Sequence, residues 1–181
     1  MEFFLKLLQC FFCWEVKSDA ADVMCEADVI IALSFGASHE DPNKSNVALA
    51  RNVTVLRTVC NLPIIVQWEI GNYLSSSFHT DFLSIYKHRE EGKYLDTYEV
   101  LAQAFEACRD HDLEKVIVVA HPDHVWRAIM TARKMGFDVV VPPISDIPYD
   151  QESTQPWTRS RTRFMVREIP ARIIYLFKGW I

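Results

Sequence analysis

Two histidines, an aspartate and an arginine follow an apolar run in the second half of the chain: His121, Asp123, His124 and Arg127. Imidazoles exchange protons near neutral pH, and an arginine can hold a carboxylate or a phosphate through two parallel hydrogen bonds. The run before them, residues 116–120, predicts a buried strand, and the spacing after them predicts the start of a helix. Because open α/β sheets bind ligands beyond the carboxyl ends of their strands, this group indicates a site.

Polar residues also follow the other predicted strand ends and one predicted helix start: Ser34, Gly36, Gln67, Glu69 and Thr97. Apolar runs at 28–34 and 62–67 predict the two strands that lead into the first four of these residues. Exposed amides expected at the helix starts near Thr97 and His124 favour an anion, which Arg127 would clamp. Together these residues predict a site for an anionic or zwitterionic small molecule.

Each of these residues also has a purely structural interpretation. A histidine at a helix start often caps the helix or hydrogen-bonds the backbone, and Arg127 can simply pair with a nearby carboxylate. Asp96 and Glu99 are explained by a capping box, in which side chains satisfy the first amides of a helix. Gln67 and Glu69 can be solvated loop residues. Both interpretations stay open at the level of the sequence.

Several standard active-site motifs are missing from the sequence. His121 and His124 have a spacing seen in zinc sites, but no further Cys, His or carboxylate pair completes the ligands, so we expect no metal. There is no Gly-x-x-x-x-Gly-Lys-Ser/Thr loop, and residues 34–38 contain too few glycines for the dinucleotide fingerprint. Neither a Gly-x-Ser-x-Gly elbow nor a thiol-phosphatase loop is present. Classical NTP or NAD binding and covalent catalysis are therefore not expected.

Three predicted helices alternate with the predicted strands, at 45–60, 96–108 and 123–135. Ser45 or Asn46 would cap the first helix, and Gly136 would end the third. A last strand is predicted at 137–141. This alternation implies one domain over 1–181 with a Rossmann-like α/β fold: a doubly wound, mostly parallel sheet of roughly four or five strands flanked by helices.

Three segments outside this alternation have predictions of their own. The apolar residues within 1–20 predict an amphipathic N-terminal helix, and the run is too short to span a bilayer. Residues 71–94 turn polar and predict an irregular excursion or lid. Residues 158–178 predict a C-terminal helix, which Pro170 should kink or divide in two. The arginines from Arg159 to Arg167 are either a charged helix surface or a cover for an acidic ligand.

Composition narrows the class of protein. A net charge of -5 argues against a nucleic-acid binder that works through bulk electrostatics. The five cysteines are odd in number and lack the spacing of a disulfide framework, so we expect free thiols and a cytoplasmic location. In Cys10-Phe-Phe-Cys13, buried packing is a better interpretation than redox chemistry. Composition leaves the oligomeric state open.

The unit that runs from residue 116 through His124 and Arg127 to Gly136 resembles the YdcF-like family, which includes SanA and ElyC and carries His-x-x-Arg-Ala after a strand. Arg51 in the first long helix and Thr97 before a later one match family positions in the same order. The resemblance implies a Rossmann-like domain of largely unknown activity. It also implies S-adenosylmethionine binding, known for some members, and envelope maintenance, known for others.

The chain departs from the family pattern at its turns. The glycine pairs that the family has after its first two strands are replaced at 34–36 and 67–69, and His121 stands where a small polar residue is usual. A side chain at such a turn blocks the close approach of the backbone to a phosphate. A divergent member with a different ligand is the expectation.

Two classes of function fit these observations. In the first, the strand ends bind a small polar, anionic or nucleotide-like ligand, with S-adenosylmethionine implied by the resemblance. An enzyme of this class would be a transferase or hydrolase, in which His124 and His121 move protons and Arg127 and Asp123 hold the ligand. In the second, a non-catalytic module senses a metabolite or meets a protein partner, through 71–94 or the basic run.

Overall fold

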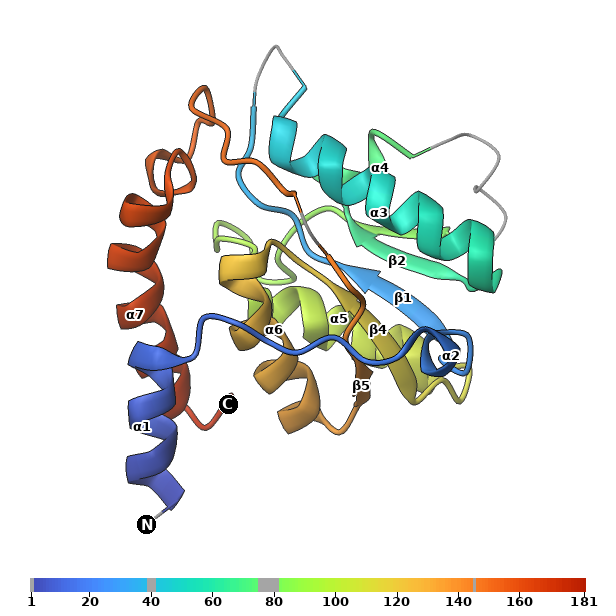
Figure 1. Ribbon diagram of the computed structural model, residues 1–181, viewed down its shortest axis with the longest axis horizontal. Helices are drawn as coiled ribbons and strands as arrows, with labels where there is room; N and C mark the ends of the chain where they lie inside the picture. The colour runs from blue at the N-terminus through green and yellow to red at the C-terminus, as the bar shows by residue number, and fades with distance from the viewer. Residues whose placement is uncertain (1, 39–41, 75–81, 145) are drawn as a thin grey trace.

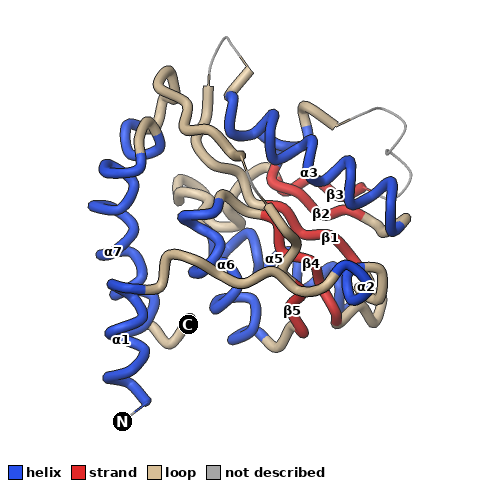
Figure 2. Tube along the Cα trace, in the orientation of Figure 1, coloured by secondary structure: helices blue, strands red, loops and turns tan. Residues whose placement is uncertain are grey.

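The computed structural model describes residues 2–38, 42–74, 82–144 and 146–181, and its centre is a five-stranded parallel sheet (Figures 1 and 2). The strands are short: β1 Val29–Ala32, β2 Ile64–Gln67, β3 Phe82–Ile85, β4 Lys115–Val119 and β5 Asp138–Val140. They lie in the order β3-β2-β1-β4-β5, and each neighbouring pair is parallel. This arrangement confirms the predicted Rossmann-like α/β fold.

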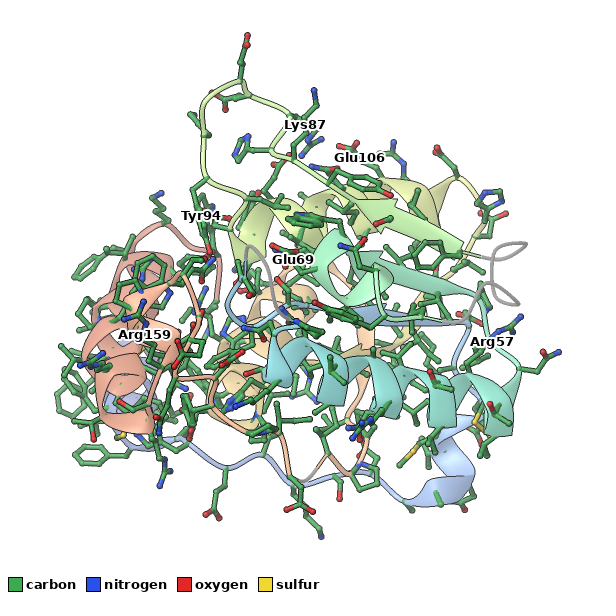
Figure 3. All side chains as sticks on the ribbon, turned by 90° about the horizontal axis from the view of Figure 1, so that it is seen from above. Arg57, Glu69, Lys87, Tyr94, Glu106 and Arg159 are labelled. Atoms are coloured by element: carbon green, nitrogen blue, oxygen red, sulfur yellow. A yellow bond between two sulfur atoms is a disulfide. The ribbon has the colours of Figure 1, made fainter. Side chains whose placement is uncertain are left out.

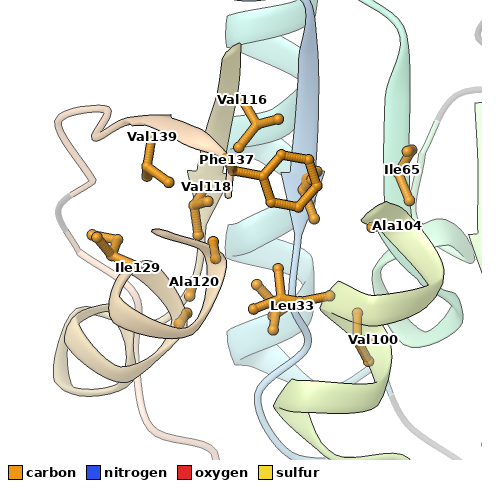
Figure 4. Close-up of a cluster of buried hydrophobic side chains, with 14 of the residues drawn as sticks. Leu33, Ile65, Val100, Ala104, Val116, Val118, Ala120, Ile129, Phe137 and Val139 are labelled. Carbon is orange, nitrogen blue, oxygen red and sulfur yellow. The ribbon is translucent and has the colours of Figure 1, made fainter. Parts of the chain in front are cut away.

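Helices flank the sheet on both faces: α1 Glu2–Phe12, α2 Ala21–Met24, α3 Lys44–Cys60, α4 Trp68–Gly71, α5 Thr97–Arg109, α6 Pro122–Met135 and α7 Arg161–Phe177, with a 3₁₀ turn at Pro156–Thr158. Successive strand residues point to opposite faces. Val29 and Ile31 therefore pack towards α5 and α6, the layer drawn in Figure 4, whereas Ile30 and Ala32 pack towards α3. Strands buried on both faces carry continuous apolar runs, which is why the sequence revealed them.

The strand order creates a crevice beside β1. The chain builds outward from β1 to β3 and then returns past β1 to form β4 and β5. Where the order reverses in this way, the connections leave opposite faces of the sheet and open a ligand-binding crevice beyond the carboxyl ends of the strands. The residues that follow β1 and β4 face this crevice.

The edge strand β3 lies inside the segment that was predicted to be irregular, 71–94. It pairs with β2 along its length, so that prediction was wrong for residues 82–85. Only Ile85 of its four residues is buried. Because the strand is short and half-exposed, its sequence lacks the continuous apolar signal of the central strands. Residues 75–81 of the same segment lie outside the described residues.

The C-terminal helix runs without interruption through Pro170, so the predicted division into two helices was wrong. Proline has no amide, which leaves the carbonyl of Val166 without its helical donor. Both residues are exposed, and water can therefore satisfy that carbonyl. The N-terminal helix is shorter than predicted, because α1 ends at Phe12. No helix of the described residues is both long enough and apolar enough to cross a membrane.

Both ends of α3 differ from the sequence-based prediction. Asn43 caps the helix by accepting a hydrogen bond from the amide of Asn46, so neither Ser45 nor Asn46 is the cap. At the other end, Cys60 forms a disulfide with Cys25. The expectation of free thiols is wrong for this pair because residues far apart in sequence meet in the fold. The remaining three cysteines are free, and the two of Cys10-Phe-Phe-Cys13 pack in a small apolar cluster, as predicted.

Candidate functional site

A cavity of about 280 Å³ lies beyond the carboxyl ends of β1 and β2, between the start of α5 and one side of α7. Hydroxyls, an amide, aromatic rings and cations line it, among them Ser34, Thr97, Gln67, Tyr94, Trp157, Trp180, Arg167 and Lys178. In Figure 3, Tyr94 stands on the side of the loop before α5 that faces α7. Concave sites that combine apolar walls with a few polar groups are typical of small-molecule binding, so this cavity is the candidate site.

Six of the nine predicted site residues line the cavity: Ser34, Gly36, Gln67, Thr97, His124 and Arg127. His121 and Asp123 are buried at the start of α6 and do not line it. Arg51 lies elsewhere, exposed on α3 at the border of another pocket with Lys44 and Asp150. The fold therefore separates Arg51 from the group that it was predicted to join.

The polar groups beyond β1 and β2 belong to Ser34, Gln67 and Glu69. The amide of Ser34 donates to Oε1 of Gln67 at 3.2 Å, which ties the two strand ends together. One carboxylate oxygen of Glu69, Oε2, is buried without a hydrogen-bond partner in the described part of the chain. Burial raises the pKa of Glu69, although Ser34 and Gln67 beside it act in the opposite direction. Glu69 itself does not line the cavity, and one of its two oxygens is left without a partner in that part of the chain.

Arg127, by contrast, is held by the protein itself. Its Nε and Nη2 donate to the two oxygens of Glu168 at 2.9 and 2.8 Å, and Nη1 donates to Oγ1 of Thr97 at 2.9 Å. Burial would raise the pKa of Glu168, but the charge of Arg127 holds it well below its usual range. The arginine therefore has its counter-ion already, as in the structural interpretation of the sequence.

The hydrogen bonds of His124 identify the protonated nitrogen of its ring. Nη2 of Arg127 lies 3.2 Å from Nδ1, and because a guanidinium only donates, Nδ1 must accept. The neutral ring then carries its proton on Nε2 and donates it to Oγ1 of Thr97 at 3.2 Å. Burial and then the charge of Arg127 lower the pKa of His124, which keeps the ring neutral. Thr97 accepts twice and keeps its own proton for a further acceptor.

Glu168 and Arg172 complete this buried cluster, and the sequence reasoning did not select either as a site residue. Arg172 donates to Oε1 of Glu168 at 3.1 Å, to the carbonyl of Cys13 at 2.6 Å and to the carbonyl of Asp123 at 3.2 Å. A signal was present: both charges share the helical spacing of the buried Phe164, at i, i+4 and i+8. Charged residues on an apolar helix face predict an internal ion pair.

His121 caps α6. Its Nδ1 accepts a hydrogen bond from the amide of Asp123 at 3.2 Å, and its ring stacks on Phe35 with 3.8 Å between the centroids. Burial lowers the pKa of His121 to about 4. The capping interpretation therefore describes His121, and a neutral ring packed against another ring is poorly placed to exchange protons with a ligand.

Asp123 and Gly36 also satisfy contacts within the protein. Asp123 accepts hydrogen bonds from Nε of Arg161 at 3.1 Å and from the hydroxyl of Tyr149 at 2.5 Å. Gly36 has φ +80°, and a Cβ there would lie 2.7 Å from the hydroxyls of Ser153 and Thr158. The glycine thus lets the segment before α7 approach the loop after β1.

The amides at the helix starts are not exposed, contrary to the prediction. At the start of α5, the amide of Glu99 donates to Asp96 at 3.0 Å, and the amide of Tyr98 donates to the hydroxyl of Tyr175 at 3.1 Å. The start of α6 is capped by its own histidine, as described above. The carboxylate of Glu99 turns instead to Arg89, with 2.8 Å between Oε1 and Nε, so only half of the capping box forms. An anion would have to rely on side chains.

Among the described residues, no group of three or more His, Cys, Asp or Glu side chains is arranged to hold a metal ion. Comparison of the chain with protein families, with curated proteins and with solved structures finds no match. Fold and site together define an α/β protein with a ligand-sized cavity beside the topological switch point of its sheet.

Proposed function

We propose that the protein is a divergent YdcF-like domain that binds a small anionic, nucleotide-like ligand in the cavity beyond β1 and β2. The observation that carries the proposal is the lining of this cavity, which combines cations with flat aromatic rings. The guanidinium of Arg167 lies over the ring of Trp157 at 4.6 Å, and the ammonium of Lys178 lies over that of Trp180 at 4.1 Å. Neither cation has a carboxylate partner within the described residues, so each can still meet an anion.

The chemistry of the lining favours a ligand with two parts. An anionic group would meet Arg167 or Lys178, which stand far apart along α7. A flat ring would stack on Tyr94 or Trp157, because Trp180 already lies between Tyr98 and Lys178. Thr97 and Gln67 supply hydrogen bonds that orient the ligand. A volume of about 280 Å³ suits a small molecule rather than a dinucleotide. S-adenosylmethionine is the first compound to test, because the YdcF-like resemblance implies it.

The contacts of His124 favour ligand binding over a function in which this residue acts as an acid or base. Both nitrogens of its ring are engaged, with Arg127 and Thr97, so the ring has neither a free lone pair nor a free proton for a substrate. We therefore favour the non-catalytic, metabolite-sensing class. Glu69 combines a raised pKa with an unpartnered oxygen, as a general base would, but it does not line the cavity, so it does not alter this preference.

The cytoplasmic location expected from the sequence remains a prediction. The disulfide between Cys25 and Cys60 weighs against it, because reducing compartments keep most thiols free. Titration of free thiols in protein purified under non-reducing conditions would count three if the bond forms and five if it does not.

A calorimetric screen tests the binding proposal. The probes are S-adenosylmethionine, adenosine monophosphate and inorganic phosphate, each titrated into the wild type and into Arg167→Gln. The matched control is Arg163→Gln, an exposed arginine of the same helix that does not line the cavity. We expect a saturable signal with at least one probe, weakened about tenfold by Arg167→Gln and unchanged in the control. The absence of binding by any probe, or equal losses in both variants, would contradict the proposal.

A further inference from the structure

The helices α1 and α7 lie side by side on one flank of the molecule (Figure 1). They pack through Cys10 of α1 and through Tyr175 and Leu176 of α7, which belong to one small apolar cluster. At the end of α7, the rings of Phe3 and Phe177 lie 5.7 Å apart. The two helices thus form one continuous surface, which we call the α1–α7 flank.

The α1–α7 flank exposes an unusual amount of apolar surface. Of the fifteen large apolar side chains that are exposed among the described residues, α1 carries six and α7 carries three. Phe4, Phe12 and Phe177 are 64%, 77% and 71% exposed. Single exposed apolar residues need no explanation, but a contiguous group of this kind on a water-facing surface marks an interaction site.

Cations without carboxylates accompany these apolar side chains. The outward face of α7 carries Arg163, Arg167 and Lys178 at positions i, i+4 and i+15, on the same side of the helix as the exposed Ile174 and Phe177. The one carboxylate in this helix, Glu168, is buried and paired with arginines. In a chain with a net charge of -5, this face is therefore a local positive surface.

We propose that the α1–α7 flank docks on the surface of an anionic phospholipid bilayer. In this orientation α1 lies in the plane of the interface, its phenylalanines enter the boundary between headgroups and acyl chains, and the cations of α7 meet the lipid phosphates. Apolar side chains combined with basic residues are the chemistry that such a surface recognises. The proposal stands on the exposed flank. It shares Arg167 and Lys178 with the lining of the cavity, so its test relies on Arg163 and on the phenylalanines of α1.

A second copy of the chain fits this surface less well. In a symmetric dimer the same patch meets itself, so the cations of both copies would enter a single interface. The exposed face of α7 offers them no carboxylate, because Glu168 is turned inward. Lipid phosphates neutralise these cations, whereas a second copy would repel them.

Vesicle flotation tests the proposal with the full chain. The vesicles are pure phosphatidylcholine, or phosphatidylcholine mixed with phosphatidylglycerol. We expect the wild type to float with the anionic vesicles and to be released by added salt. Phe4→Ser with Phe12→Ser should weaken this binding at least about tenfold. Arg163→Gln, which leaves the cavity lining intact, should weaken binding to the anionic vesicles alone.

The matched control is Val55→Ser with Val59→Ser, two valines of α3 that are 62% and 70% exposed on another surface of the molecule. Its affinity for vesicles should not change. All of these side chains are exposed, so circular dichroism should report the same fold in every variant.

Three results would overturn the proposal. In the first, the wild type ignores both kinds of vesicle. In the second, the α3 control loses as much binding as the α1 variant. In the third, light scattering detects a dimer that Phe4→Ser with Phe12→Ser dissociates, without vesicle binding, which would assign the α1–α7 flank to a second copy.

Discussion

Beyond β4, the side chains of Asp123, His124 and Arg127 all find partners inside the protein, although Nε2 of His121 has none among the described residues. Beyond β1 and β2, the carboxylate of Glu69 keeps a buried oxygen without a partner among those residues. Both groups border the same switch-point region of one sheet. The difference arises from α7, which lies against α6 and brings Glu168 to the residues beyond β4. The residue types therefore indicated where the cavity lies, but the fold decides which of their atoms remain free for a ligand.

Of the variants that test this comparison, Glu168→Gln should lose the most stability. The variant leaves Arg127 and Arg172 buried without their carboxylate, and removal of one member of a buried ion cluster costs about 3–5 kcal/mol. Urea denaturation of the wild type and of Glu168→Gln measures this loss. Glu106→Gln is the control, because that half-exposed carboxylate pairs with Arg89 and should cost about 1 kcal/mol or less. Similar values for the two would mean that the cluster beyond β4 is not structural.

Acid should lower the free energy of unfolding through His121, which lies beyond β4. The native pKa of this histidine is about 4 and the unfolded one is 6.5, so the unfolded state takes up the proton first as the pH falls. Stability is therefore full above pH 6.5 and declines by up to about 3 kcal/mol as the pH approaches 4.

The measurement for His121 is urea denaturation at neutral pH and near pH 5. In His121→Asn, which keeps a good helix cap, the decline should be smaller, and the part that remains comes from His124 and from carboxylates with lowered pKa values such as Glu168. His111→Asn changes an exposed histidine and serves as the control. An unchanged decline in His121→Asn would show that His121 is not buried as a neutral ring.

The same comparison explains which features could be predicted from the sequence. The central strands and α5 and α6 were predictable because strands buried on both faces carry continuous apolar runs and helices repeat every 3.6 residues. The partner of Arg127 was not predictable, because Glu168 lies 41 residues away and a local pattern contains no information on that pairing. The wall of the cavity on α7 was predicted only in part for a related reason. The basic run with Arg167 had two interpretations, and Lys178 reaches the cavity only because α7 remains one helix through Pro170.

Gly36→Ala tests the contact between the loop after β1 and the segment 153–158. A Cβ at φ +80° is strained and would lie 2.7 Å from two hydroxyls, so the loop after β1 or the segment 153–158 has to shift. We expect a loss of about 1–3 kcal/mol in the free energy of unfolding. Gly92→Ala is a suitable control, since Gly92 also has a positive φ but its Cβ would meet nothing within 4 Å. The difference between the two variants isolates the steric contribution, and the absence of a difference would mean that segment 153–158 does not press on Gly36.

Glu69→Gln should have the smallest effect on stability and the opposite sign. Because burial raises the pKa of Glu69 above its unfolded value of 4.5, ionisation at neutral pH favours the unfolded state. The amide removes that cost, so the free energy of unfolding should rise slightly at neutral pH, and the gain should shrink as the pH falls towards the raised pKa of the carboxyl. Acid then strengthens this side of the switch-point region while it weakens the side of His121. Urea denaturation of Glu69→Gln, of His121→Asn and of the double variant, at neutral pH and near pH 5, separates the two contributions. A loss of stability in Glu69→Gln at neutral pH would mean that the carboxylate has an internal partner and that the two sides are alike.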